Sequence, residues 1–159
     1  MEQAASGRPV KILVVEDNPA DARMMRYALQ QESTWHTEMV VVEDGDRAIQ
    51  YLTEQSFLGQ ATRPDLVVLD LNLPKRDGTE VLQAIRTTEG LEKLPVVILS
   101  SSPEDVSERV VQRANLEADY YLMKPADVDD FLALGTVLMR WYNGRMLADA
   151  MAPTSAAPR

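Results

Sequence analysis

Apolar and polar residues follow two alternating patterns between residues 11 and 141. Short runs of β-branched and other apolar residues are each followed by a longer segment whose apolar positions recur at helical spacing. This alternation is typical of repeated strand–helix units around a parallel sheet, and five units can be counted. The predicted strands are 11–15, 37–42, 66–69, 96–99 and 120–123. Because these runs are continuously apolar, we expect helices on both faces of the sheet.

The predicted helices are marked by their first residues. Asn18 and Ser102 each precede a proline, and a capping residue before a proline at the first helical position is typical of a helix start. The first helix is predicted over 19–32. Others are predicted to open near residues 44, 78, 103 and 126, and after Asn143-Gly144 the pattern weakens to one or two possible turns.

Five polar residues fall at or just past the carboxyl ends of predicted strands. They are Glu16, Asp17, Asp70, Ser100 and Lys124. Each alone has a structural explanation, such as a helix cap, a turn or a loop hydroxyl. Because the carboxyl ends of parallel strands meet at one edge of the sheet, where ligands bind in open α/β folds, we expect all five to converge.

Three carboxylates held within about 4–5 Å of one another repel by several kcal/mol per pair, so their assembly implies a cation. With oxygen ligands and no thiol, the set favours Mg²⁺ or a similar ion such as Mn²⁺, which commonly completes its shell with phosphate. Asp70 is then the predicted nucleophile, with Lys124 neutralising the transferring phosphoryl group. Ser100 offers a hydroxyl to a phosphate oxygen, and Tyr121 could respond to its movement.

Composition and charge limit the other possibilities. The chain has 159 residues, no cysteine and a net charge of −9, with dispersed basic residues, so nucleic acid is not an expected partner. No apolar run is long enough to cross a membrane, and the lack of cysteine agrees with a cytoplasmic location. We predict a disordered leader over 1–9, a folded domain over 10–142 and a C-terminal arm over 143–159.

From about Lys11 to about Arg140 the chain resembles response-regulator receiver domains. The resemblance rests on VVEDN at 14–18, PDLVVLDLNLPKRDG at 64–78, LPVVILS at 94–100 and YYLMKP at 120–125. It implies a flavodoxin-like, CheY-like α/β fold with five helices and a doubly wound sheet of strand order 2-1-3-4-5. The family receives its phosphoryl group from a phosphohistidine of a sensor histidine kinase. His36, the only histidine, is interpreted as a surface residue.

The resemblance also implies roles for individual residues. The metal would be held by the Asp17 and Asp70 carboxylates and the Asn72 backbone carbonyl, with Glu16 acting largely through water. Ser100 and Tyr121 would form a switch, and the bond from Lys124 to its proline would be cis. Ser100 stands where threonine is commoner in the family, which keeps the hydroxyl and loses a methyl group.

Details of the motifs resemble the single-domain regulators paired with bacterial phytochromes. Only 19 residues follow Arg140, so we expect output through protein contacts. The last helix carries more apolar residues than one core-facing stripe needs, which predicts a homodimer through this helix with 145–151 as an embracing arm. The alternative is that Trp141 and Tyr142 fold back on their own domain.

Three rival classes share parts of the pattern. A pseudo-receiver that binds without phosphorylation usually lacks an acid or the lysine, and here none is missing. Haloacid-dehalogenase-like phosphatases carry an Asp-x-Asp motif after the first strand of the fold, whereas Asp70-Leu71-Asn72 follows the third strand, which counts against this class. A flavodoxin-like cofactor binder needs small hydroxyl residues where Glu16 and Asp17 would repel phosphate.

Overall fold

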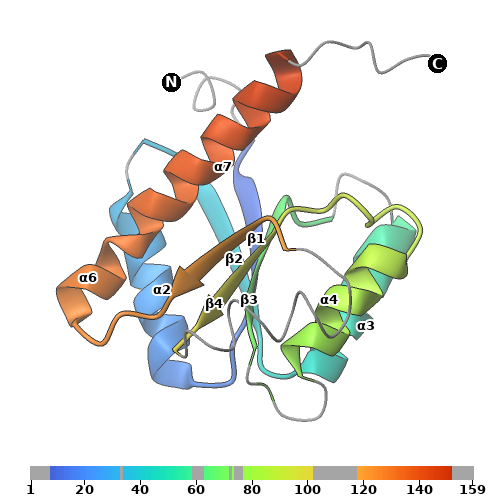
Figure 1. The fold of residues 1–159 in the computed structure, drawn as a ribbon, viewed down its shortest axis with the longest axis horizontal. Helices are drawn as coiled ribbons and strands as arrows, with labels where there is room; N and C mark the ends of the chain where they lie inside the picture. The colour runs from blue at the N-terminus through green and yellow to red at the C-terminus, as the bar shows by residue number, and fades with distance from the viewer. Residues whose placement is uncertain are drawn as a thin grey trace.

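The centre of the protein is a five-stranded parallel sheet with the order β2-β1-β3-β4-β5 (Figure 1). The structure is a computed structural model, and it describes residues 8–32, 34–58, 63–71, 73, 77–101 and 118–151. The strands are β1 (Val10–Val15), β2 (Thr37–Val42), β3 (Leu66–Asp70), β4 (Val96–Ser100) and β5 (Tyr120–Met123). The predicted strands and their order are therefore confirmed, and β3 and β4 each run one residue further to include Asp70 and Ser100.

The helices start where side chains satisfy the first free backbone N–H groups. Asn18 Oδ1 accepts from the N–H groups of Ala20 at 2.9 Å and Asp21 at 3.2 Å, and Asp77 forms a capping box with Glu80. The helices that follow β1, β2 and β3 are α2 (Pro19–Gln31), α3 (Gly45–Leu58) and α4 (Gly78–Thr87). The helix predicted to start at Ser102-Pro103 lies outside the described residues.

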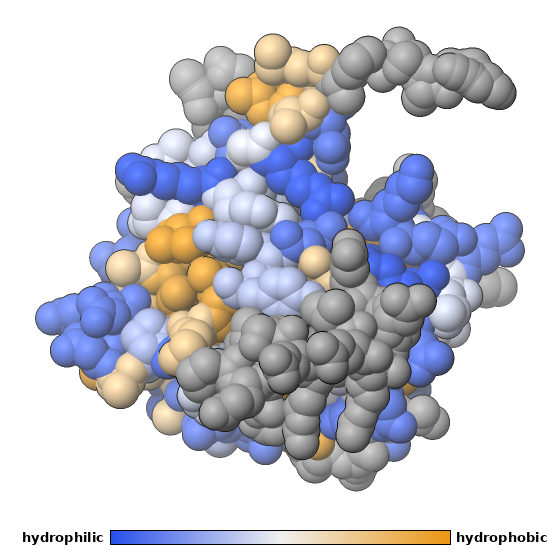
Figure 2. All heavy atoms as spheres, in the orientation of Figure 1, coloured by the Kyte–Doolittle hydropathy of each residue, from blue (hydrophilic) through white to orange (hydrophobic). Residues whose placement is uncertain are grey.

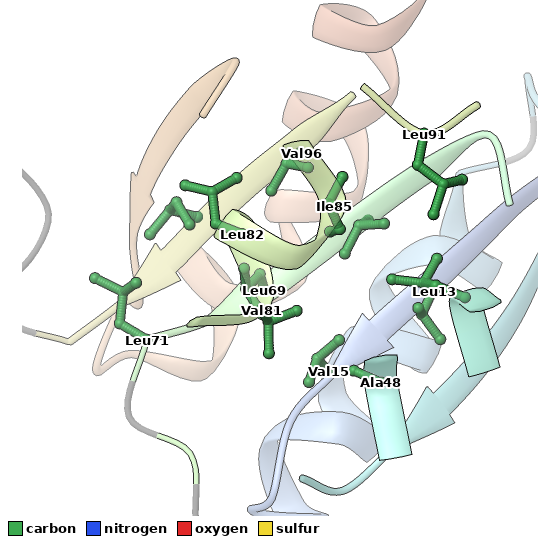
Figure 3. Close-up of a cluster of buried hydrophobic side chains, with 13 residues drawn as sticks. Leu13, Val15, Ala48, Leu69, Leu71, Val81, Leu82, Ile85, Leu91 and Val96 are labelled. Carbon is green, nitrogen blue, oxygen red and sulfur yellow. The ribbon is translucent and has the colours of Figure 1, made fainter. Parts of the chain in front are cut away.

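Alternating strand residues build one core on each face of the sheet, as expected for strands whose side chains point to opposite faces. Leu13 and Leu69 contribute to the core under α3 and α4 (Figure 3). Ile12 and Val68 contribute to the core under α2 and the C-terminal helices. Figure 1 shows these helix groups on opposite sides of the sheet, so the prediction of strands covered on both faces is confirmed.

The C-terminal helical region differs from the single helix predicted to begin near Ala126. α6 (Val128–Leu132) begins after Asp127, whose side chain accepts from two backbone N–H groups of the first turn, and α7 (Leu134–Met151) follows after one intervening residue. α7 passes through Asn143-Gly144 without a break, so the predicted domain boundary at 142–143 falls inside a helix. The apolar pattern weakens after Gly144 although the helix continues to Met151, and the pattern gives no sign of the break at Ala133.

The middle of α7 is held against its own domain. Trp141 stacks on Tyr120 with ring centroids 5.1 Å apart and an interplanar angle of 8°, and both Trp141 and Tyr142 pack on the core. Burial raises the pKa of Tyr142 to about 12, with the charge of Asp65 acting in the same direction and Arg8 opposing it. For these two aromatic residues the alternative of folding back on the same domain is confirmed.

An ion-pair network fixes the next turn of α7. The Arg145 guanidinium pairs with Asp119, which also binds Arg86 at 2.9 Å and accepts from the Val96 N–H at 2.8 Å. Arg145 also lies over the Trp141 ring, 5.8 Å from its centroid. The segment predicted as an arm is therefore tied to the sheet as far as Arg145, and only the last turns of α7 extend beyond the sheet (Figure 1).

Two further expectations concern the backbone and membranes. Among the described residues every peptide bond is trans, so the expected cis bond after Lys124 is wrong for this structure. Trans is the form that bonds before proline favour by about 0.5–1 kcal/mol. No helix in the described part of the chain has the length and apolar character needed to span a bilayer.

Two glycines of α7 provide a matched test of packing. A Cβ at Gly135 would lie 2.3 Å from the Ala28 carbonyl oxygen of α2, whereas a Cβ at Gly144 would meet nothing within 4 Å. We expect Gly135→Ala to lower the free energy of unfolding by about 1–3 kcal/mol through overpacking. Gly144→Ala should raise it by about 0.5–1 kcal/mol through helix propensity. Urea unfolding measures both, and equal effects would contradict the close approach of α7 to α2.

Candidate functional site

The parallel register brings the predicted polar residues to one edge of the sheet. Asp70 ends β3 and Ser100 ends β4, while Glu16 and Lys124 directly follow β1 and β5. Backbone hydrogen bonds continue the sheet past these strand ends, from Glu16 N–H to Val42 carbonyl at 3.0 Å and from Lys124 N–H to Ser100 carbonyl at 2.8 Å. The edge positions are thus fixed by backbone pairing, and the side chains are presented from rigid elements.

Three carboxylates form the acidic part of the site. One oxygen each from Glu16, Asp17 and Asp70 lies within 4.8 Å of the others. Glu16 and Asp70 are 4% and 5% exposed, whereas Asp17 is exposed to solvent. At an effective dielectric near 20 each pair repels by about 3–4 kcal/mol, and burial reduces hydration. The donor set fits a hard cation such as Mg²⁺, which these three carboxylates would hold.

The Lys124 ammonium brings a positive charge into contact with two of these carboxylates, Glu16 and Asp70. It lies 2.9 Å from Glu16 Oε1, 2.8 Å from Asp21 Oδ2 and 3.1 Å from Asp70 Oδ2. Burial acts to lower the pKa of Lys124, but the hydrogen bonds to Asp21 and Glu16 and the charge of Asp70 outweigh it. The pKa of the ammonium therefore stands above its usual value, and Lys124 keeps its charge next to Asp70.

Glu16 is the carboxylate most affected by its surroundings. Burial raises its pKa to about 7, and the negative charge of Asp70 adds to the rise. The hydrogen bonds from Lys124 and from the Asn18 N–H, at 3.1 Å, oppose it. The rise is caused mainly by burial, with Asp70 adding to it, so a cation bound beside these carboxylates would favour the ionised form of Glu16.

The two predicted switch residues lie on the adjacent strands β4 and β5. Ser100 is fully buried at the end of β4. Tyr121 is half-buried and packs on the core beneath α4, and its hydroxyl oxygen accepts from the Ala118 N–H at 3.4 Å. The structure thus shows Tyr121 packed on this core with its hydroxyl at Ala118, and the switch itself stays a prediction.

The segment after Asp70 is shaped by a close backbone contact. Asn72, predicted to offer its carbonyl to the metal, lies outside the described residues. Gly78 donates its N–H to the Leu71 carbonyl at 3.0 Å, and a Cβ at Gly78 would lie 2.7 Å from the Asp70 carbonyl oxygen. Glycine at this position lets the start of α4 pack directly against the backbone that carries Asp70.

Asp21 is a site residue that the sequence analysis missed. It lies in the first turn of α2, where an acid is favoured by the helix dipole and needs no other explanation. Its carboxylate nevertheless makes the shortest of the three contacts to Lys124. The available signal was its position in the turn after Asp17, since side chains there can return to the edge from which the helix starts.

Comparison with known proteins identifies the family. The model of the response regulator receiver domain matches residues 12–134. Response regulator Rcp1 of Synechocystis is 36% identical over 129 residues, which cover 81% of this chain and 86% of Rcp1. The chain therefore belongs to the response regulator receiver domain family, whose members are phosphoacceptor signalling proteins.

Solved structures agree with this membership. The crystal structure of the phosphorylated cyanobacterial phytochrome response regulator RcpA is similar, with a TM-score of 0.72 and 36% identity, and the match covers 85% of this chain and 94% of RcpA. The Mn²⁺-bound form of Rcp1 gives a TM-score of 0.69 and 33% identity, covering 84% and 95% of the two chains. Among receiver domains, the chain is thus similar to phytochrome-associated regulators.

Removal of the ammonium tests the charge balance of the site. Lys124→Met should lower the free energy of unfolding by about 3–5 kcal/mol in EDTA, because Glu16 and Asp70 would remain buried without their cationic partner. Millimolar Mg²⁺ should recover part of the loss, measured by urea unfolding. Lys93→Met, at an exposed lysine, is the control. If both variants were equally stable in EDTA, Lys124 would not be the compensating charge.

Proposed function

We propose that this protein accepts a phosphoryl group on Asp70 from a sensor histidine kinase, in a Mg²⁺-dependent reaction. The observation that carries the proposal is the position of Asp70, which shares its edge with two further carboxylates and has an ammonium 3.1 Å from its Oδ2. An Asp70 carboxylate oxygen attacks phosphorus and forms an acyl phosphate. The bond between phosphorus and the leaving group breaks, and the leaving group takes the electron pair.

The proposed roles of the neighbouring residues follow from their chemistry. Glu16, Asp17, Asp70 and the Asn72 carbonyl would hold Mg²⁺ or Mn²⁺, and the ion when bound supplies positive charge to the phosphoryl oxygens. Lys124 keeps a second positive charge close to Asp70. Ser100 would donate its hydroxyl to a phosphoryl oxygen, and Tyr121 would change rotamer in response.

A phytochrome-type kinase is the proposed upstream partner. This proposal is supported by the similarity to Rcp1 and to the phytochrome response regulator RcpA over most of each chain. A cytoplasmic location stays a prediction. We propose that the phosphorylated protein signals through protein contacts. The net charge of −9 agrees with protein rather than nucleic-acid partners.

We also propose a homodimer through the exposed end of α7. Trp141 and Tyr142 no longer support it, because both pack on their own domain. The support moves to Leu147 and Met151, which are 56% and 75% exposed. Figure 2 shows apolar atoms gathered at this projecting end of α7, where a second copy could cover them.

The phosphoacceptor is tested by intact mass after incubation with acetyl phosphate and Mg²⁺. The wild-type chain and Asp130→Asn, a change at an exposed acid of α6, should each gain one phosphate. Asp70→Asn should gain none, because the nucleophilic carboxylate is replaced by an amide. A wild-type chain that gains no phosphate, or an Asp70→Asn chain that gains as much, would show that the proposal is wrong.

The dimer is tested without disturbing the core. Leu147→Glu combined with Met151→Glu should convert a dimer to a monomer in light scattering, because two charges would be buried at the interface. The control is Ala148→Glu with Ala150→Glu, which adds the same charge at other exposed positions of α7. Thermal melting should be similar for both pairs. A wild-type chain that is monomeric at 100 μM would refute the dimer directly.

A further inference from the structure

The three carboxylates around Lys124 are not equivalent. The side chains of Glu16 and Asp70 are 4% and 7% exposed, whereas that of Asp21 is 22% exposed. Asp21 also stands outside the group of acids whose oxygens lie within 4.8 Å of one another. It therefore contacts the ammonium without belonging to the candidate metal site.

Capping of α2 does not account for this contact. The N–H groups of Ala20 and Asp21 are already satisfied by the Asn18 side chain at 2.9 and 3.2 Å. The Asp21 carboxylate is instead directed to Lys124, 103 residues later in the chain, at 2.8 Å. The contact joins α2 to the residue that follows β5, so it depends on the tertiary fold rather than on the local helix start.

An ammonium has three N–H donors, and here three carboxylates surround it. A phosphoryl group on Asp70 would bring anionic oxygens that need a donor from the same ammonium. These oxygens would compete with the carboxylates of Glu16 and Asp21 for the donors of Lys124. Releasing Asp21 costs less than releasing Glu16, because the Asp21 carboxylate is the more exposed of the two and can regain hydration.

We propose that Asp21 is a positioning residue that holds the third donor of Lys124 in the unphosphorylated chain and thereby restrains phosphoryl transfer to Asp70. This inference rests on the proposed function. In the transfer, an Asp70 oxygen forms the new bond to phosphorus and the leaving group departs with its electron pair. Lys124 keeps all its protons and exchanges its contact with Asp21 for one with the phosphoryl oxygen.

The initial rate of phosphorylation tests the restraint. With acetyl phosphate and saturating Mg²⁺, followed by intact mass, Asp21→Asn and Asp21→Ala should react about three- to tenfold faster than wild type, because a competing negative charge is removed. Asp21→Glu keeps the charge and should remain near the wild-type rate. Asp130→Asn removes a first-turn acid from α6 and should also match wild type. Unchanged or slower rates for Asp21→Asn and Asp21→Ala would overturn the inference.

A double-mutant cycle separates an effect through Lys124 from a direct effect on the phosphodonor. In a Lys124→Met chain, followed over hours in Mg²⁺, Asp21→Asn should change the rate less than about twofold, since no ammonium is left to hold. An equal acceleration in both backgrounds would show that Asp21 acts on the donor directly, which would overturn the positioning role.

Urea unfolding adds a measurement that does not depend on phosphorylation. It is applied to the wild type, Asp21→Asn, Lys124→Met and the double variant. Asp21→Asn should lower the unfolding midpoint in the wild-type background and have little effect in the Lys124→Met background. If the two substitutions changed the unfolding free energy additively, Asp21 and Lys124 would not interact, and the inference would be overturned. A wild-type chain that gains no phosphate would instead overturn the proposed function and the restraint on transfer, while this cycle would still show whether Asp21 and Lys124 interact.

Discussion

The concentration of negative charge at one edge of the sheet is the constraint on which the site depends. Three carboxylates contact a single ammonium, a fourth lies within 4.8 Å of two of them, and two of the four are almost fully buried. Burial, with the charge of Asp70 adding to it, raises the pKa of Glu16, and the contacts with the surrounding carboxylates keep Lys124 charged. A site of this kind favours a divalent cation and, with it, an anionic group that both positive charges can contact.

The sheet maintains this arrangement because its strands are parallel and their register is fixed by two cores. Leu13 and Leu69 pack on one face, and Ile12 and Val68 on the other. A slip of one residue would exchange the two faces of a strand and bury the wrong side chains. Burial of the apolar residues therefore opposes such a slip. The same burial keeps the repelling carboxylates together at the strand ends.

Much of the fold and most of the site could be predicted because their signals are local or topological. The strand runs, the Asn18 cap and the strand-end position of Asp70 are all visible in the sequence. Asp21 could not be recognised, because an acid in the first turn of a helix is adequately explained by the helix dipole. Its contact with Lys124 joins residues 103 positions apart, and only the folded structure reveals it.

The C-terminal helix shows why apolar content alone is a poor guide to an interface. Its aromatic residues looked surplus to one core-facing stripe, yet Trp141 stacks on Tyr120 and Arg145 is tied to Asp119. Tyr120 and Asp119 directly precede Tyr121, the predicted switch residue. The apolar face that remains is at the far end of α7, beyond these contacts. Tyr120 packs on the core under the C-terminal helices, whereas Tyr121 packs on the core of the opposite face, so the contacts that hold α7 and the predicted switch residue lie on different faces of the sheet.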